Sequence, residues 1–253
     1  MRIDLNADVG ESFGAYVIGH DAGLMRWITS ANVAAGFHAG DPSVLRATIR
    51  RAKSHGVAVG AHPSFPDLAG FGRREMSMSP REAEDLVLYQ IAAVAGVAQV
   101  EGVTLQHVKP HGALYNMAAR DVALAGAVAR AVAAFSRSLI LLGPPNSELL
   151  KAGKAFGLRV AGEAFADRAY EPDGSLVSRK KLGAVIHDVN AVVERAIRMA
   201  REGTVVAIDG TVVHLSAETI CVHGDTPGAD ELVAELRAAL EGAGVSVKPI
   251  AAA

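Results

Sequence analysis

The sequence has one cysteine, few aromatic residues and no excess of charge of either sign. Cys221 is the only thiol among 253 residues, which excludes an internal disulfide and a zinc site built from several cysteines. Lys and Arg number 25 against 27 Asp and Glu, so the chain lacks the positive field that draws proteins to nucleic acid or to anionic membranes. We therefore expect no nucleic acid and no membrane among its partners, but a small, roughly neutral substrate.

Long hydrophobic runs and low-complexity segments are also missing. The aliphatic stretch 91–100 is interrupted by Gly96 and Gln99 and is shorter than the ~20 residues that cross a bilayer. Charges within the first eight residues argue against a secretion signal. Since 50% of the residues are hydrophobic and no linker marks a boundary, the sequence predicts a single soluble, cytoplasmic domain over residues 1–253.

Short apolar runs alternate with longer segments of helical periodicity, which is typical of consecutive βα units. We predict about seven strands, at residues 3–7, 28–34, 57–61, 106–108, 139–142, 159–165 and 219–222. Helices are expected at residues 42–55, 80–101, 118–135, 147–156, 184–201 and 230–242. This order predicts an α/β fold of the (β/α) TIM-like barrel type. Residues 209–215 fit either a strand pair or an insertion.

Histidine stands at the expected end of four of these apolar runs. His38, His62, His111 and His223 each lie beside a small or turn-forming residue. All strands of a (β/α) barrel deliver their carboxyl ends to one face, so we expect most of these imidazoles to meet in a common pocket. A single histidine at a strand end is more often a structural group, but four in the same relative place favour a site.

The first strand carries acids on one side. Residues 4–11 alternate so that Asp4, Asn6 and Asp8 point away from the neighbouring apolar residues. Inside a barrel covered by helices, such acids must be paired or catalytic. We favour a functional role for Asp8 and Glu11, and leave functional and structural roles equally open for Asp4 and Asn6.

Two segments carry candidate anion-binding cations. His107, Lys109 and His111 share one face of a strand, and a lysine beside imidazoles can hold a phosphate or stabilise an oxyanion. The Pro- and Gly-rich loop 60–74 ends in two arginines, of which Arg73 is the better candidate for an anion clamp. The structural alternatives are a lysine that reaches water and an ordinary surface loop.

Other polar groups support no single interpretation. Asp167, Arg168 and Arg179 form either a pocket wall or an ion-pair network. The four strand-end histidines with Asp8 and Asp225 could supply a divalent metal site, although no HxH or HExxH spacing specifies one. No phosphate-binding glycine motif is present, so ATP binding does not follow from the residues alone.

Several segments closely resemble the LamB/YcsF family, in order and over nearly the whole chain. The matching segments are 4–11, 36–41, 60–67 with 71–73, 107–116, 165–168 and 222–225. The family often reads Ala-Cys-Gly-Phe-His where this chain has Ala35 at the second position, which argues against a catalytic role for that thiol here. The resemblance implies a distorted seven-stranded (β/α) barrel similar to glycoside hydrolase and deacetylase barrels.

The resemblance also implies an activity and a set of roles. The activity is ATP-dependent opening of 5-oxo-L-proline to L-glutamate by a multi-subunit 5-oxoprolinase. In that enzyme this chain would be the A subunit, beside two further subunits. Whether the chain also forms a homo-oligomer is left open. In this scheme the catalytic candidates orient water, hold phosphate and donate to substrate oxygens; they are Asp8, Glu11, His38, His62, Lys109, His111 and His223. The candidates for binding substrate or phosphate are Asn6, Asp41, Arg73, Asp167, Arg168, Arg179 and Asp225.

The same fold leaves two other functions open. One is a metal-dependent deacetylase or amidohydrolase, in which histidines and Asp8 hold a divalent ion that activates water without ATP. The other is a non-catalytic scaffold for partner subunits. Fold analogy does not choose among them, since one barrel hosts many chemistries, but the matching segments favour the lactam-opening activity.

Overall fold

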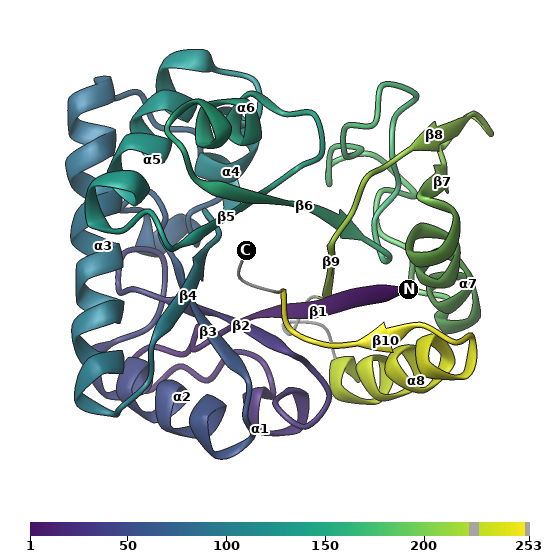
Figure 1. Cartoon of the computed structure of the whole chain (residues 1–253), viewed down its shortest axis with the longest axis horizontal. Helices are drawn as coiled ribbons and strands as arrows, with labels where there is room; N and C mark the ends of the chain where they lie inside the picture. Colours follow the sequence, from purple (N-terminus) through teal and green to yellow (C-terminus); the bar gives the residue numbers. More distant parts are fainter. Residues whose placement is uncertain (223–227, 251–253) are drawn as a thin grey trace.

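A closed barrel of parallel strands surrounded by helices forms the computed structural model, which describes residues 1–222 and 228–250 (Figure 1). The ring contains β1 (Arg2–Val9), β2 (Ser30–Ala34), β3 (Ala58–His62), β4 (Leu105–Val108), β5 (Ile140–Gly143), β6 (Arg159–Phe165) and β9 (Thr219–Val222). Each strand pairs with the next, and β9 pairs with both β6 and β1, which closes the ring. The predicted seven-stranded (β/α) barrel is confirmed.

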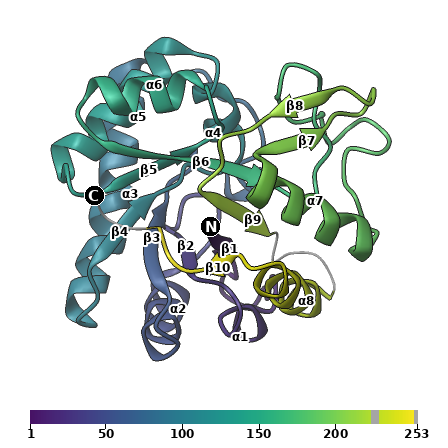
Figure 2. The same ribbon diagram turned by 45° about the vertical axis from the view of Figure 1, so that its right-hand side comes forward.

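The helices lie outside this ring (Figures 1 and 2). They are α1 (Asp21–Leu24), α2 (Pro42–Ser54), α3 (Pro80–Val100), α4 (Gly112–Ala118), α5 (Val122–Phe135), α6 (Glu148–Ala155), α7 (Val189–Glu202) and α8 (Ala229–Gly242), with a 3-10 turn, η1, at Leu68–Gly70. A short strand, β10 (Ser246–Val247), pairs with the start of β1. The uncertain segment 209–215 contains one strand of a pair, because β8 (Val212–His214) forms an antiparallel ribbon with β7 (Thr204–Val206) beside α7 (Figure 2).

Capping side chains explain where the helices begin. Asp41 and Ser79 accept hydrogen bonds from the first turns of α2 and α3, each with proline at the start of the helix, as the sequence predicts. Two predicted helix starts were too early by several residues, and the helix α4 was not predicted. The helix expected over 118–135 begins at 122 because Asp121 caps it, and the helix expected from 184 begins at 189 because Asp188 caps it.

The barrel interior is polar on one side and apolar on the other. Along β1, alternate residues place Asp4, Asn6 and Asp8 against polar partners on neighbouring strands, while the residues between them join the main apolar core. On the opposite side, Ile140, Leu142 and Ala161 form an apolar cluster with Ile250. The polar groups extend along β1 toward the carboxyl ends of the strands, where the candidate functional residues lie.

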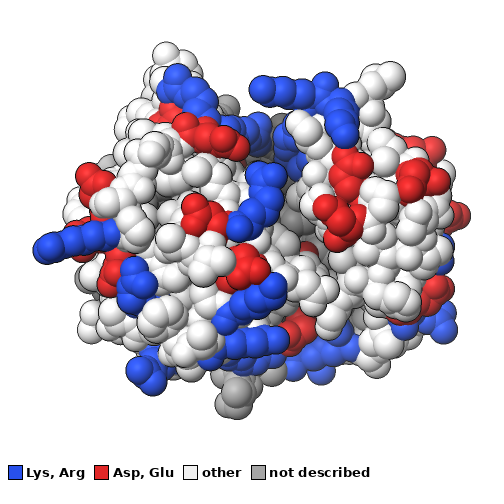
Figure 3. All heavy atoms as spheres, turned by 90° about the horizontal axis from the view of Figure 1, so that it is seen from above, with Lys and Arg blue, Asp and Glu red and all other residues white. Residues whose placement is uncertain are grey.

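The surface agrees with the balanced composition. Figure 3 shows acidic and basic side chains interspersed over the face that it presents. Among the described residues, α3 is long and apolar enough to cross a membrane, a test that the core helix of a soluble protein also passes. In the structure α3 packs along α5 and buries a row of side chains that includes Val87, Ile91 and Val94.

Candidate active site

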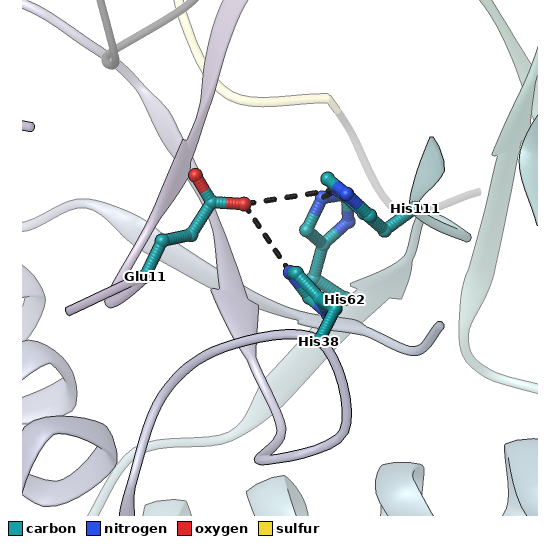
Figure 4. A group of neighbouring side chains, drawn as sticks. All are labelled: Glu11, His38, His62 and His111. Carbon is teal, nitrogen blue, oxygen red and sulfur yellow. Dashed lines mark hydrogen bonds and ion pairs between the residues drawn. The ribbon is translucent and has the colours of Figure 1, made fainter. Parts of the chain in front are cut away.

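Four side chains from four successive βα connections meet at the mouth of the barrel. Glu11 follows β1, His38 follows β2, His62 ends β3 and His111 follows β4 (Figure 4). Each offers a ligand atom, and these atoms all lie within 4.8 Å of one another. All four residues are buried, with exposed fractions of 6% or less. The predicted meeting of strand-end histidines with an acid is therefore present in the structure, and we call this group the mouth cluster.

Hydrogen bonds to carbonyl oxygens fix the position of one ring hydrogen in two of these imidazoles. His62 Nδ1 lies 2.7 Å from the oxygen of Lys109, and His111 Nε2 lies 2.9 Å from the oxygen of Phe71. A carbonyl oxygen only accepts, so both of these nitrogens carry a hydrogen. The other nitrogens, His62 Nε2 and His111 Nδ1, face each other at 2.9 Å.

His38 completes the cluster by contacting both Glu11 and His111. Its Nε2 lies 3.2 Å from Glu11 Oε1, and its ring stacks on that of His111 with 3.9 Å between centroids. Its Nδ1 has no hydrogen-bond partner among the described residues, so the ring hydrogen belongs on Nε2 and is donated to Glu11. Burial, with neighbouring imidazoles, holds the pKa of both His38 and His111 well below the ordinary value, so both rings are neutral at pH 7.

Directly beneath the mouth cluster, Lys109 lies between two carboxylates. Its Nζ is 2.9 Å from Asp8 Oδ1 and 2.8 Å from Glu163 Oε1, and it also contacts Asn6 and the Cys221 sulfur. Burial favours the neutral amine, yet the carboxylates and the thiol raise the pKa of Lys109 well above its usual value. The lysine is therefore a permanent cation inside the barrel.

Asp8 connects this lysine to the mouth cluster. Its second oxygen lies 3.3 Å from His62 Nε2, and Asn32 donates to its first oxygen. Burial by itself would raise the pKa of Asp8, but the nearby His62 side chain and the Lys109 ammonium hold it well below the ordinary value. Asp8 is thus an ionised carboxylate placed between a cation and an imidazole.

The loop after β3 packs against the outer side of the mouth cluster. Gly72 has a φ of +65°, and a Cβ there would lie 2.2 Å from Ser64 Oγ and 2.8 Å from His111 Cδ2. Glycine is required because only it combines this backbone angle with such close approach. Arg74 pairs with Asp67 within the loop, whereas the guanidinium of Arg73 lies 5.0 Å above the Phe71 ring at the mouth.

Comparison with known proteins decides the family. The family model described as the LamB/YcsF family matches residues 3–253. This chain belongs to the LamB/YcsF family. It is 58% identical over 248 residues to the 5-oxoprolinase A subunit of Chloroflexus aggregans, covering 98% of each chain, and 53% identical to that of Thermococcus onnurineus, covering 99% of this chain and 98% of the relative.

One solved structure agrees with this assignment, and a second shares the fold. The lactam utilization protein from Thermus thermophilus superposes with a TM-score of 0.94 at 49% identity, over 99% of this chain and 100% of that one. A family 4 carbohydrate esterase from Streptomyces lividans matches with a TM-score of 0.50 at 14% identity, over 99% and 93% of the two chains. The second match shows a shared fold only, and it confirms the expected likeness to deacetylase-type barrels at that level.

The remaining predicted residues of this LamB/YcsF chain lie around the site. Asn6 is fully buried below Lys109 and joins Thr219 and Asn32. Asp41 caps α2 and also accepts from the Gly14 amide. His223 and Asp225 lie outside the described residues.

The cations predicted to line the pocket have different surroundings. Arg168 is buried, and its guanidinium donates to the carbonyl oxygens of Ala184 and Val177, so it fastens the connection after β6. Burial lowers its pKa to about 10. Asp167 is buried beside it, whereas Arg179 is exposed. The structure thus supports a role for Arg168 in a structural network more than in a pocket wall.

The sequence did not identify Glu163 or Asn32 as members of the site, and it placed His107 on the same face as Lys109 without giving it a role. Glu163, Asn32 and His107 are fully or almost fully buried in the barrel, and His107 Nε2 lies 2.8 Å from Asn32 Oδ1. The ring of His107 occupies the space that a side chain at position 60 would fill, which explains Gly60. The alternation of Glu163, Phe165 and Asp167 was a signal for Glu163, but its lysine partner lies on a strand distant in sequence.

Asp4, left open between two roles, is structural in this barrel. Its carboxylate accepts hydrogen bonds from the hydroxyls of Thr29, Ser30 and Thr219. Burial raises its pKa despite these bonds. The residue ties three strands together at the amino-terminal half of the barrel, below Asn6 and away from the mouth cluster.

Proposed function

We propose that this chain is the A subunit of a 5-oxoprolinase and contributes its barrel mouth to the hydrolytic opening of 5-oxo-L-proline to L-glutamate. The observation that carries the proposal is identity of more than half of the residues, over essentially full length, to relatives named as that subunit. The structural match to a protein named for lactam utilization supports the same class of substrate. Because these relatives are named as subunits, the proposal includes a complex with two further chains.

The buried acids and imidazoles suit the water-addition step of this reaction. Opening the lactam requires a base for water, a donor for the ring nitrogen and groups that stabilise a developing oxyanion. The ionised Asp8 lies 3.3 Å from His62 Nε2, which gives a proton acceptor backed by an imidazole. Glu11 with His38 forms a second such pair at 3.2 Å. We assign water activation to Asp8.

The proposal includes ATP as co-substrate of the assembled enzyme. An amide carbon is a poor electrophile, and transfer of the γ-phosphoryl group to the amide oxygen, with release of ADP, activates that carbon. One water then adds to it, the carbon–nitrogen bond breaks as nitrogen takes a proton, and a second water releases phosphate. Arg73, an exposed cation at the mouth, is the phosphate-binding candidate. Lys109 is already held by two carboxylates, so we assign it to fixing Asp8 instead.

Measurement of glutamate and ADP release from 5-oxoproline and ATP tests the proposal. The chain alone and the chain mixed with its two candidate partner subunits are compared, and turnover is expected in the mixture. Asp8→Asn is expected to lower kcat by roughly 10²–10⁴-fold. Asp209→Asn, at an exposed turn, is the matched control and should leave kcat unchanged. A mixture shown to assemble that releases no glutamate would reject the assignment.

A second function, hydrolysis of an acyl amide without ATP, is favoured by one observation. The mouth cluster combines one carboxylate and three imidazoles, a donor set suited to a metal that activates water. The two functions differ in their nucleotide requirement. ATP-independent release of acetate from an N-acetylated sugar by the chain alone would favour this alternative over lactam opening.

A further inference from the structure

The donor atoms of the mouth cluster converge on one point at the carboxyl end of the barrel (Figure 4). We propose that His62 Nε2, His111 Nδ1 and the Glu11 carboxylate bind a divalent transition-metal ion of the Zn²⁺ class, while His38 orients Glu11. The ion lies in the site of the proposed function, so this inference deepens that function. It concerns binding, however, and is tested by metal content rather than turnover.

The facing imidazole nitrogens give the first argument. His62 Nε2 and His111 Nδ1 are 2.9 Å apart, and when both rings are neutral each of these nitrogens carries a lone pair, because the opposite nitrogen of each ring donates to a carbonyl oxygen. Two lone pairs at this separation repel, and no hydrogen bond joins two neutral acceptors. A cation between them turns this repulsion into coordination.

The outer contacts of the two rings give the second argument. A histidine that binds a metal usually donates its other ring hydrogen to a carbonyl or carboxylate, which fixes the tautomer and the ring plane. Both His62 and His111 do this, with the oxygens of Lys109 and Phe71. His38 does not, since its Nδ1 has no partner among the described residues. It is therefore better suited to donate to Glu11 than to bind the ion.

Charge gives the third argument. Glu11 and Glu163 bring two buried carboxylates to this level of the barrel, Asp8 brings a third that is 14% exposed, and Lys109 brings one buried ammonium. In their ordinary ionised forms these groups leave an excess of two negative charges in a region of low dielectric, which is costly. A divalent cation at the mouth cluster offsets that excess.

The donor types indicate the kind of ion. Imidazole nitrogens suit zinc and its neighbours in the first transition row, whereas magnesium and calcium prefer oxygen donors. In a tetrahedral zinc site, with metal–nitrogen distances of about 2.0–2.1 Å, ligand atoms lie roughly 3.3 Å apart. The separations of 2.9 Å between His62 and His111 and 3.7 Å between His111 and Glu11 bracket that value. Two histidines and one glutamate leave the fourth position open for water or a substrate oxygen.

Metal analysis of the purified chain tests this site directly. The chain is dialysed against a chelator, reloaded with Zn²⁺ and freed of excess metal, and its zinc content is measured by mass spectrometry. We expect one zinc per chain and a zinc-dependent rise in Tm. Reloading with Co²⁺ should give the visible absorption bands of a tetrahedral ion with nitrogen ligands. Absence of bound metal and of any shift in Tm would overturn the proposal.

Variants separate the ligands from their neighbours. Glu11→Gln, His62→Ala and His111→Ala are expected to lose stoichiometric zinc, while His38→Ala keeps it with weaker affinity. His214→Ala, at an exposed position of β8, should bind like the unchanged chain. Circular dichroism checks that each variant is folded, and the nearly isosteric Glu11→Gln serves if a histidine variant does not fold. Two results would reject these ligands. One is that His214→Ala loses zinc to the same extent as the ligand variants. The other is that Glu11→Gln, His62→Ala and His111→Ala are folded and still retain zinc.

The same preparations keep this result distinct from the proposed function. Glutamate release by an assembled complex that binds no zinc would reject the metal site and leave lactam opening intact. Stoichiometric zinc in a chain whose complex never opens 5-oxoproline would leave the site in place and remove the assigned reaction.

Discussion

A single ammonium group, that of Lys109, compensates the acids in the middle of the barrel. It is 3% exposed and pairs with Asp8 and Glu163, which come from different strands of the ring. Removing one partner of a buried ion pair usually costs more than the pair itself contributes, because the remaining charge stays buried without compensation. Lys109 is therefore expected to affect both the stability of the chain and the ionisation of Asp8.

We expect Lys109→Met to lower the free energy of unfolding by about 3–5 kcal/mol, measured by urea denaturation at pH 7. Lys151→Met removes an exposed lysine paired with Glu148 and should cost about 1 kcal/mol or less. Equal effects of the two substitutions would show that the buried carboxylates do not depend on Lys109.

Gly72 places the loop after β3 against the mouth cluster. Gly72→Ala combines a positive φ with a Cβ that meets Ser64 and His111, so we expect a loss of stability of more than about 1–2 kcal/mol and a fall in turnover. Gly14→Ala is the matched control, since Gly14 also has a positive φ, +56°, but a Cβ at that position would have nothing within 4 Å. Thermal unfolding measures the loss of stability, and glutamate release measures turnover. Equal Tm and equal turnover for Gly72→Ala and Gly14→Ala would contradict the steric argument.

At the scale of elements, Glu101 joins α2 to the end of α3. Its carboxylate binds Arg46 and Arg50, and hydrogen bonds from these arginines lower its pKa from 4.5 to about 2. Because the folded pKa is lower than the unfolded one, this contribution to stability is present above about pH 4.5 and is lost as the pH falls toward 2.

Glu101→Gln should therefore make the free energy of unfolding less dependent on pH between 4.5 and 2. Urea denaturation across this range measures the slope. Glu148→Gln, which alters only an exposed pair with Lys151, is the control and should keep the slope of the unchanged chain. A Glu101→Gln slope equal to that of the unchanged chain would show that the arginine contacts do not persist in solution.

The elements that sequence patterns predicted well are those with local signals. Buried runs of apolar residues predict the ring strands, and Asp41 and Ser79 predict the starts of α2 and α3. The break between α4 and α5 escaped because residues 118–135 keep an apolar, alanine-rich composition across Asp121. The part of the site that lies at strand ends was predicted from the sequence. Glu163 was not predicted as a site residue, because its pairing with Lys109 forms only when the ring of strands closes.

At the scale of the whole molecule, the last described residue of the chain packs on the strands β5 and β6. Ile250, 4% exposed, packs on Ile140, Leu142 and Ala161, and its carbonyl accepts from Gln106. We expect Ile250→Ala to cost about 2–5 kcal/mol of unfolding free energy with unchanged zinc content, since it opens a cavity among residues that are not part of the mouth cluster. Val212→Ala, at an exposed position, is the control for urea denaturation. Loss of zinc from folded Ile250→Ala would show that these apolar contacts and the mouth cluster are coupled.

The pairing of β9 with β1 has a consequence for how the chain is made. Asp4 lies opposite Thr219, so the first strand obtains its second neighbour only after most of the chain has left the ribosome. Until then β1 to β6 form an open sheet with two free edges, which can pair with other chains. At the usual pace of synthesis this stage lasts for seconds. A nascent chain that stops before β9 also leaves the Asp4 carboxylate without the Thr219 hydroxyl, so premature termination yields an open sheet that is prone to aggregate rather than a smaller barrel.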